Sequence, residues 1–206
     1  MVHIFCVEGN IAAGKSTLLQ HVQELDANIV VIPERVASWQ GRETGINLLQ
    51  RFYEEPESTA FPFQLMVLHT RIHDVMRAMK NATQDTIVLV ERSLESDRIF
   101  AKQNRDLGRI SDLEWAVYEL MFHESQTLMH VKGRILLEVP VSVLEQRIAS
   151  RGRSEEDAIT RSYLSALDTA HNEKFASMSN VYRAKNEDIN CVAKHTLAWM
   201  RQMIEK

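Results

Sequence analysis

Cysteine and long apolar segments are scarce in this sequence. Only two of the 206 residues are cysteines, Cys6 and Cys191, and both lie in apolar runs typical of strands. We therefore expect two small core residues in a reducing compartment and no disulfide. Because no run of about 20 apolar residues is present, the sequence predicts no transmembrane helix. The first predicted strand begins by residue 3, so we also expect no signal or transit peptide and a cytoplasmic location.

A basic excess is absent too. The 24 Lys and Arg residues are outnumbered by 28 Asp and Glu residues, whereas proteins that bind nucleic-acid polymers are usually basic. A small-molecule partner is therefore the better expectation. The chain is long enough for one domain with a sizeable core, and it contains no internal repeat, low-complexity segment or linker. We predict a single domain spanning residues 1–206.

Strand-like and helical patterns alternate along the chain. The predicted strands lie near residues 3–7, 29–32, 86–90, 134–139 and 189–193. The predicted helices span residues 15–26, 45–53, 58–80, 94–105, 111–130, 141–150, 157–178 and 194–205. This alternation predicts an α/β protein with three layers, in which helices cover both faces of a parallel sheet of about five strands. Ligands of such sheets bind beyond the carboxyl ends of the strands.

The segment after the first strand has the pattern of a phosphate-binding loop. It satisfies G-x-x-x-x-G-K-[ST] between a predicted strand and a predicted helix, with the residues Gly9, Asn10, Ile11, Ala12, Ala13, Gly14, Lys15, Ser16 and Thr17. The glycines let successive backbone N–H groups point into one concavity that binds anions. In such a loop Lys15 reaches the β- and γ-phosphates and the Ser16 hydroxyl is a ligand of Mg²⁺. We therefore predict a P-loop fold that binds a nucleoside triphosphate.

Acidic residues follow the next two strands. A carboxylate at Glu34 can orient an attacking hydroxyl and accept its proton; a helix N-cap acid is the alternative interpretation. Glu91 stands one residue past a buried strand, like the acid with which P-loop enzymes hold Mg²⁺. Arg92 beside it suits the capture of phosphate or carboxylate.

Two further groups of polar residues accompany these acids. On the helix predicted at 58–80, Gln64 and Arg71 share one stripe with apolar residues. An amide there can recognise the edge of a base, although an arginine that snorkels from the helix face remains an alternative for Arg71. Three arginines, Arg147, Arg151 and Arg153, flank a glycine and predict a lid at about residues 147–158 that closes over phosphates. A solvated basic patch is the alternative.

Together these segments resemble the deoxynucleoside kinase family of the deoxycytidine, deoxyguanosine and deoxyadenosine kinase type. The motifs that carry the resemblance are the loop at residues 9–17, Pro33-Glu34 with Trp39, Tyr53-Glu54-Glu55-Pro56, Phe63-Gln64, Glu91-Arg92-Ser93 with Ser96-Asp97-Arg98, residues 151–156, and Asn186-Glu187-Asp188. The phosphate loop alone is generic, whereas the order and spacing of all these motifs are specific to the family.

The resemblance implies a nucleotide-salvage enzyme that transfers the γ-phosphoryl of ATP to the 5′-hydroxyl of a deoxyribonucleoside, with Mg²⁺. It implies that Glu34 is the general base, that Glu91 is the acid associated with Mg²⁺, and that Arg92 lies beside the 5′-oxygen. Tyr53 and Glu156 would hold the sugar 3′-hydroxyl. Further implied substrate positions are Trp39, Phe52, Phe63, Gln64, Val67, Arg71, Asp97 and Phe100; the lid arginines and the segment with Glu187, Asp188 and Ile189 would serve ATP.

The preferred base and the reaction class have alternatives. Arg71 with Asp97 resembles the charged pair of the kinases that accept deoxycytidine or purine deoxynucleosides, so we expect these to be favoured over thymidine. A broad-specificity enzyme that accepts thymidine stays open. Glu34 would repel the phosphate of a nucleoside monophosphate, which disfavours a thymidylate-kinase-like reaction. A non-catalytic switch is disfavoured because the sequence has no Asn-Lys-x-Asp stretch.

The helices predicted at 58–80 and 111–130 carry more apolar residues than one sheet face needs, among them Met76, Trp115, Leu120, Leu128 and Met129. Relatives pair the corresponding helices in a dimer, and twofold pairing is the commonest form of oligomer. The resemblance therefore predicts a homodimer with a four-helix interface.

Overall fold

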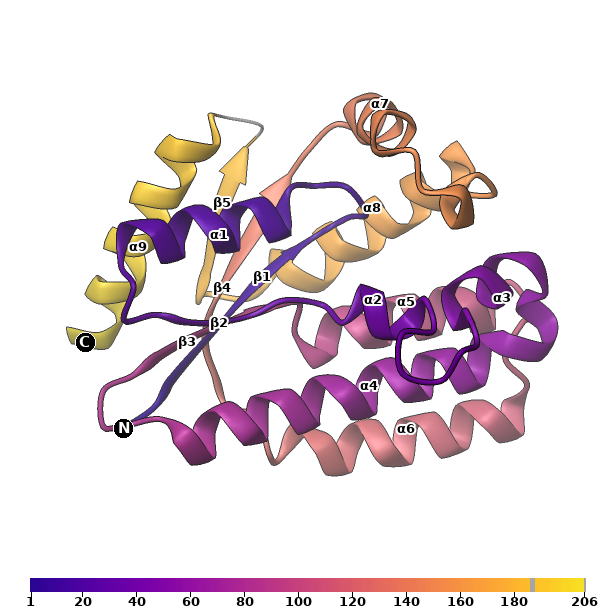
Figure 1. Ribbon diagram of the computed structural model, residues 1–206, viewed down its shortest axis with the longest axis horizontal. Coiled ribbons are helices and arrows are strands. Elements are labelled where there is room, and N and C mark those ends of the chain that lie inside the picture. The colour runs from indigo at the N-terminus through magenta and orange to yellow at the C-terminus, as the bar shows by residue number, and fades with distance from the viewer. Residues whose placement is uncertain (186–187, 206) are drawn as a thin grey trace.

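A parallel sheet of five strands forms the centre of the computed structural model, which describes residues 1–185 and 188–205 (Figure 1). The strands are β1 (His3–Gly9), β2 (Val30–Ile32), β3 (Ile87–Glu91), β4 (Val131–Glu138) and β5 (Val181–Lys185). They are ordered β2-β3-β1-β4-β5, and every neighbouring pair is parallel. The predicted α/β fold with a parallel sheet of about five strands is therefore confirmed.

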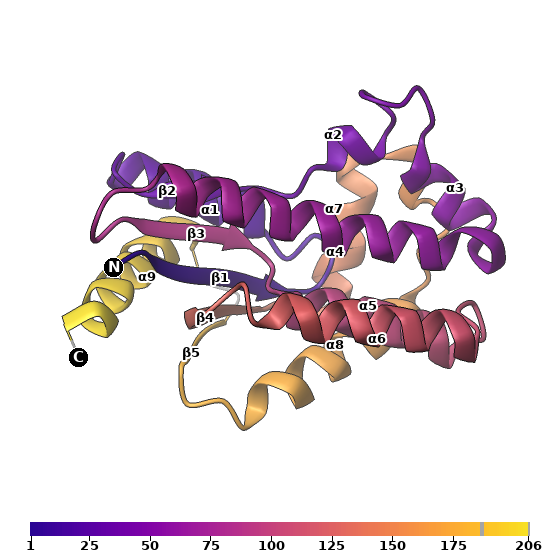
Figure 2. The same cartoon turned by 90° about the horizontal axis from the view of Figure 1, so that it is seen from below.

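Both faces of the sheet are covered, as the continuous apolar strands require. On β1, Phe5 and Val7 pack against α1 (Lys15–Leu25) and α9 (Ile189–Glu205), which lie side by side over one face (Figure 1). Ile4 and Cys6 point the opposite way, because successive side chains of a strand alternate between faces. The helices on that second face are α4 (Pro56–Asn81), α5 (Leu94–Asp106), α6 (Asp112–Gln126) and α8 (Arg161–Ala176) (Figure 2).

Shorter helices gather at the right-hand side of Figure 1, away from the two termini. They are α2 (Val36–Trp39), α3 (Leu48–Glu54), α7 (Val141–Arg151) and the 3₁₀ helix η1 (Ser154–Glu156). Gly152 ends α7 with a φ of 61°, in the left-handed conformation that glycine adopts without strain. The chain can therefore turn sharply from α7 into η1, which sets the course of the predicted lid.

The fifth strand was predicted in the wrong place. Residues 189–193 begin α9, and the strand is instead residues 181–185. The strand is at the sheet edge and only Ala184 in it is buried, so it lacks the apolar run that marks a central strand. As a consequence Cys191 is an exposed helical residue and not a core residue, whereas Cys6 is buried as expected; both cysteines are free.

The predicted helices agree better with the structure than the fifth strand does. The helix predicted at 157–178 is shorter, and α2 was not predicted. In the described part of the chain, no helix combines the length and the apolar character needed to cross a membrane.

Candidate active site

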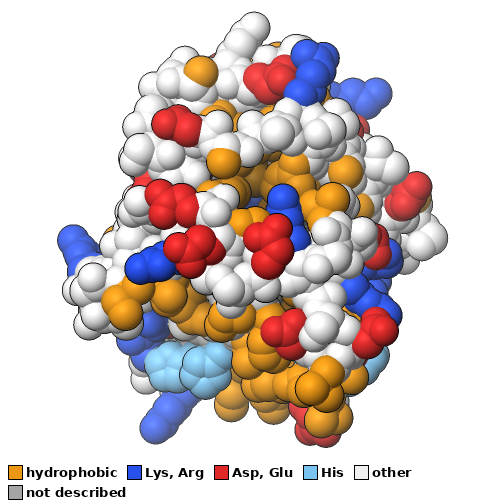
Figure 3. Space-filling view, turned by 90° about the vertical axis from the view of Figure 1, so that its right-hand side faces the viewer, with side chains coloured by type: hydrophobic (Ala, Val, Ile, Leu, Met, Phe, Trp, Pro, Cys, Tyr) orange, Lys and Arg blue, Asp and Glu red, His pale blue; other side chains and the backbone are white. Residues whose placement is uncertain are grey.

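A cavity of about 680 Å³ lies beyond the carboxyl ends of the strands. The phosphate loop, α2, α3, α4 and the lid all contribute to its walls. Figure 3 looks onto this side of the molecule, where hydrophobic and basic side chains meet in a central hollow. Predicted site residues from widely separated parts of the sequence therefore line a single space, whereas Gly9, Asn10, Arg71 and Asp188 are not among its lining residues.

The phosphate loop is shaped by two glycines with positive φ. Gly9 has a φ of 137°, and a Cβ there would lie 2.9 Å from the carbonyl oxygen of Leu137, so no other residue fits. Gly14 precedes α1 with a φ of 98°. Asn10 braces the loop: its Nδ2 donates to the Leu164 carbonyl at 2.8 Å, and its Oδ1 accepts the Ile11 N–H at 2.8 Å. Ala12 completes the curl with a φ of 60°.

Lys15 is the buried cation of the loop. Its Nζ donates to the Asn10 carbonyl at 2.9 Å, and its side chain lines the cavity together with Thr17. Burial, reinforced by the nearby Arg92 guanidinium, lowers the pKa of Lys15 to about 8. A polyanion in the cavity would reverse this effect, because opposite charge favours the protonated form.

Ser16 and Glu91 are brought together from α1 and β3. The Ser16 hydroxyl lies 2.9 Å and 3.1 Å from the two carboxylate oxygens of Glu91. Hydroxyl and carboxylate oxygens are ligands that Mg²⁺ prefers, usually with waters and substrate phosphates completing the shell. The pair thus fits Mg²⁺. The described residues contain no group of three or more His, Cys, Asp or Glu able to hold a metal.

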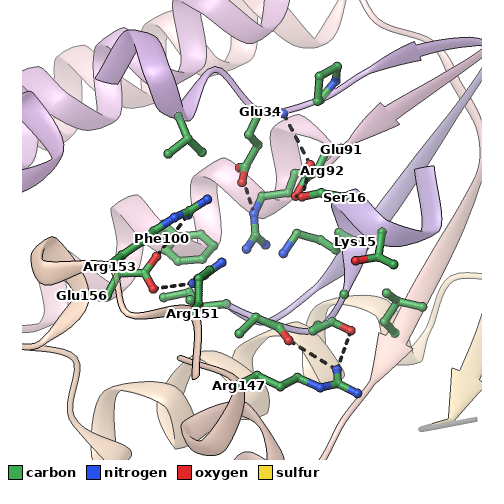
Figure 4. Close-up of a pocket in the computed structure, with 18 of the residues that line it drawn as sticks. Lys15, Ser16, Glu34, Glu91, Arg92, Phe100, Arg147, Arg151, Arg153 and Glu156 are labelled. Carbon is green, nitrogen blue, oxygen red and sulfur yellow. Dashed lines mark hydrogen bonds and ion pairs between the residues drawn. The ribbon is translucent and has the colours of Figure 1, made fainter. Parts of the chain in front are cut away.

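Glu34 points into the cavity toward Arg92 (Figure 4). Its Oε1 lies 3.0 Å from Arg92 Nε and 3.2 Å from Arg71 Nη2. Burial alone would raise the pKa of Glu34, but the guanidinium groups of Arg92 and Arg71, with Lys15, outweigh it and lower the pKa. The carboxylate is therefore ionised at neutral pH and ready to accept a hydrogen bond.

Arg92 has an unusual backbone conformation for its residue type. Its φ is 68°, in the left-handed region where side chains other than glycine are strained. The guanidinium stacks over Phe100 at 4.7 Å, and its Nη1 donates to the Gly9 carbonyl at 2.6 Å. Strain of this kind is found where surrounding structure fixes a functional side chain.

Arg71 is fully engaged inside the protein, which excludes the snorkelling alternative. Two hydrogen bonds join it to Asp97, from Nε to Oδ2 at 2.7 Å and from Nη2 to Oδ1 at 2.8 Å. It also donates to the Glu91 carbonyl. Asp97 lies in the first turn of α5, which brings it alongside α4.

Aromatic side chains line the other half of the cavity. Phe63 stacks on Phe52 with centroids 4.7 Å apart and meets Trp39 edge-on at 5.6 Å. Gln64, Val67, Phe100 and Tyr53 also line the wall. Burial raises the pKa of Tyr53, so its hydroxyl stays protonated and can donate. This half of the cavity is therefore mainly apolar, with a few polar groups, and we call it the aromatic slot.

Two of the three lid arginines contact one carboxylate. Glu156 pairs with Arg151, and its Oε1 lies 3.4 Å from Arg153 Nη1 (Figure 4). Arg147 instead reaches the phosphate loop, where its Nη1 donates to the Ala13 carbonyl at 3.1 Å. All three arginines line the cavity, and the closing of this segment over phosphates stays a prediction.

The lid is also tied to the segment around α2 and α3. Glu155 accepts hydrogen bonds from Gln40 at 3.0 Å and from Asn47 at 2.9 Å. These bonds hold η1 close to the aromatic wall.

The predicted donor-base segment is described only in part. Ile189 lines the cavity, and Asp188 Oδ1 accepts the N–H groups of Asn190 and Cys191 at 3.0 Å and 3.2 Å, as a helix cap does. Glu187 lies outside the described residues. Lys185 at the end of β5 also lines the cavity and was missed. Correct placement of the fifth strand would have pointed to it.

Comparison with known proteins agrees with this geometry. The sequence model of the family described as "Deoxynucleoside kinase" matches residues 5–202. The probable deoxycytidine kinase of Fowlpox virus (strain NVSL) is 35% identical over 87% of this chain and 74% of that protein. Deoxycytidine kinase of Homo sapiens is 32% identical over 80% of this chain and 72% of its own length. Deoxycytidine kinase 2 of Gallus gallus is 31% identical over 80% of this chain and 71% of its own length. This chain therefore belongs to the deoxynucleoside kinase family.

Proposed function

We propose that this kinase transfers the γ-phosphoryl of ATP to the 5′-hydroxyl of a deoxyribonucleoside, as a step of nucleotide salvage. One observation carries the proposal: the Glu34 carboxylate and the Arg92 guanidinium face the same cavity as a complete phosphate loop. An acid and a cation beside the reacting phosphate are the groups that in-line phosphoryl transfer to a hydroxyl requires.

The phosphate side is assigned to the loop, Lys15 and the lid. Backbone N–H groups of residues 9–17 would bind the α- and β-phosphates, and Lys15 would leave its contact with Asn10 to reach the β- and γ-phosphates. Arg147, Arg151 and Arg153 would neutralise the charge that develops during transfer. Asp188 and Ile189 would border the adenine.

Ser16 and Glu91 would hold Mg²⁺, which neutralises the phosphate charge when it is bound. Ser16 lies in the first turn of α1, directly after the phosphate loop, and Glu91 contacts it. The proposed Mg²⁺ position is therefore beside the phosphates that the loop would bind.

Glu34 is assigned to the acceptor hydroxyl. Its lowered pKa makes it a weak base, which suits a loose transition state in which the nucleophile keeps its proton until the new bond is forming. Glu34 would orient the 5′-hydroxyl and take the proton late, while Arg92 would lie beside the 5′-oxygen and the transferred group.

The aromatic slot is assigned to the nucleoside. Tyr53 and Glu156 would hold the sugar 3′-hydroxyl, and Trp39, Phe52, Phe63, Val67 and Phe100 would flank the ring systems. Gln64 and the Arg71–Asp97 pair, of which Gln64 and Asp97 line the cavity, would present polar groups to the base edge. We propose that deoxycytidine, deoxyadenosine or deoxyguanosine is preferred over thymidine.

Replacement of the proposed base tests this assignment. General-base assistance is typically worth 10²–10⁴-fold, so Glu34→Gln should lower kcat by about that factor. ATP affinity, measured by equilibrium binding, should stay near the wild-type value because Glu34 is not assigned to ATP. The exposed Glu57 makes Glu57→Gln a matched control with wild-type turnover. Near-wild-type turnover in Glu34→Gln would refute Glu34 as the base.

A further inference from the structure

A polar cluster lies behind Arg92, on the side away from the cavity. Its members are Glu8 on β1, Ser96 on α5 and His171 on α8, and they are 0%, 0% and 2% exposed. None of the three lines the cavity. Burial of a carboxylate and an imidazole is costly unless their hydrogen bonds are satisfied, so the cluster needs an explanation beyond packing.

Glu8 lies against the N-terminus of α5. Its Oε2 accepts the Ser96 hydroxyl at 2.7 Å and faces the Ser93 N–H at 3.4 Å. The positive end of the helix dipole favours a carboxylate at this position. The other oxygen, Oε1, has no hydrogen-bond partner in the described part of the chain.

The hydrogen bonds of His171 define its tautomer. Nδ1 lies 2.7 Å from the Leu167 carbonyl, which can only accept, so Nδ1 carries the proton and Nε2 presents a lone pair. Burial, with the nearby Arg92, lowers the pKa of His171 to about 3 and keeps the ring neutral. Two groups face Nε2: Ser96 Oγ at 3.3 Å and Arg92 Nη1 at 3.5 Å.

Counting protons identifies the donor to His171. Ser96 has one hydroxyl proton, and the shorter contact, to Glu8, takes it. The guanidinium of Arg92 is therefore the group that donates to Nε2. His171 also contacts Arg92 indirectly, through Phe100. The His171 and Phe100 rings meet edge-on with centroids 5.9 Å apart, and Phe100 lies beneath the Arg92 guanidinium.

We propose that His171, held by the Leu167 carbonyl, is a positioning residue that fixes the Arg92 guanidinium for phosphoryl transfer. The inference rests on the role proposed above for Arg92. His171 Nε2 and the Gly9 carbonyl accept hydrogen bonds from Arg92 Nη1, and the Phe100 ring in the cavity wall lies beneath the guanidinium. Together these contacts direct Arg92 Nε toward Glu34.

A double-mutant cycle separates positioning from simple packing. His171→Phe keeps an aromatic ring between Phe100 and Phe175 but removes the acceptor. Because a small misplacement can cost up to about 10²-fold, kcat should fall by about 10- to 100-fold, while the KM values for ATP and nucleoside stay near wild type. In an Arg92→Met background the same substitution should cause no further loss.

Two milder variants guard against a folding defect. His171→Asn keeps a donor for the Leu167 carbonyl but has no acceptor at the Nε2 position, whereas His171→Gln can place an amide oxygen there. The inference predicts a higher kcat for the Gln variant than for the Asn variant, at comparable thermal unfolding temperatures. Phe175→Leu, at a buried ring on α8 that neighbours His171, is the packing control and should leave kcat unchanged.

Each outcome decides a different point. If His171→Phe lowers kcat by the same factor with and without Arg92, or if the Gln and Asn variants are equal, the positioning role is wrong while the proposed function stands. If Arg92→Met keeps wild-type kcat, the role proposed for Arg92 fails, and the inference fails with it.

Discussion

At the scale of single residues, Arg71 links Asp97, Glu34 and Glu91, which line the cavity, although Arg71 is not itself among the lining residues. It holds Asp97 through two hydrogen bonds, lies 3.2 Å from Glu34, and donates to the carbonyl of Glu91. A buried ion pair is weak evidence for stability, because desolvation offsets the attraction. We propose that the pair acts in specificity instead, because a charged pair held beside the cavity would favour acceptor atoms on the base edge and disfavour the methyl group of thymine.

Removal of both charges should therefore change base preference. A site that hydrogen-bonds one edge can reject a mismatched base by up to about 10⁴-fold, because its buried polar groups are left unpaired. In Arg71→Met with Asp97→Ala, kcat/KM for thymidine should rise relative to that for deoxycytidine and the purine deoxynucleosides. The measurement is kcat/KM for each nucleoside at fixed ATP and Mg²⁺.

A second arginine–carboxylate pair supplies the control for this experiment. Arg98 and Glu119 form an equally direct pair, with Nε and Oε1 2.7 Å apart, between α5 and α6 and outside the cavity lining. Arg98→Met with Glu119→Ala should leave the order of preference unchanged. A wild-type enzyme that already prefers thymidine would show that the Arg71–Asp97 argument is wrong.

At the scale of secondary-structure elements, burial decided which predictions succeeded. β1, β3 and β4 are central strands with both faces covered, so their apolar runs were visible in the sequence. β5 is an edge strand with one buried residue, and the apolar residues of α9 imitated it. The helical spacing of Val192, Thr196 and Met200 was the signal that could have separated the two.

Some residues of the candidate site were likewise predictable from the sequence, and others were not. Residues with chemistry at strand ends, such as Glu34 and Glu91, were predictable because parallel strands bring their carboxyl ends to one edge. The positive φ of Arg92 and its contact with His171 were not, because they depend on how α8 packs on α5, and those elements are far apart in the chain. Local sequence patterns were enough to find the candidate catalytic side chains, whereas the residues that position those side chains could be found only from the tertiary packing.

At the scale of the whole molecule, α4 and α6 carry an exposed apolar surface. Hydrophobic side chains gather at the bottom of Figure 3, where these helices lie in Figure 1. Leu120 is 64% exposed and Leu113 77% exposed, with Met76, Val117, Met121 and Leu128 exposed as well. Trp115 and Met129, which were counted toward this surface from the sequence, are buried in the core instead. A contiguous apolar patch of this kind marks an interaction site.

We propose that this surface pairs two copies of the chain as a homodimer. Light scattering at micromolar concentration should give twice the mass of one chain, and Leu120→Glu should shift the protein toward the monomer because it places a charge in the interface. Leu107→Glu, at an exposed leucine that ends α5, is the matched control and should stay dimeric. A monomer mass for the wild-type protein would contradict the proposal.

The central claim concerns which molecule receives the phosphoryl group and at which atom. The most direct test follows label from γ-labelled ATP, with Mg²⁺, into deoxycytidine, deoxyadenosine, deoxyguanosine, thymidine and the 5′-monophosphate of each, and identifies every labelled product. We expect labelled 5′-monophosphates of the nucleosides, with thymidine the poorest acceptor, and no labelled diphosphates, because Glu34 would repel an acceptor phosphate. Label transferred to a monophosphate acceptor but to none of the nucleosides would contradict it.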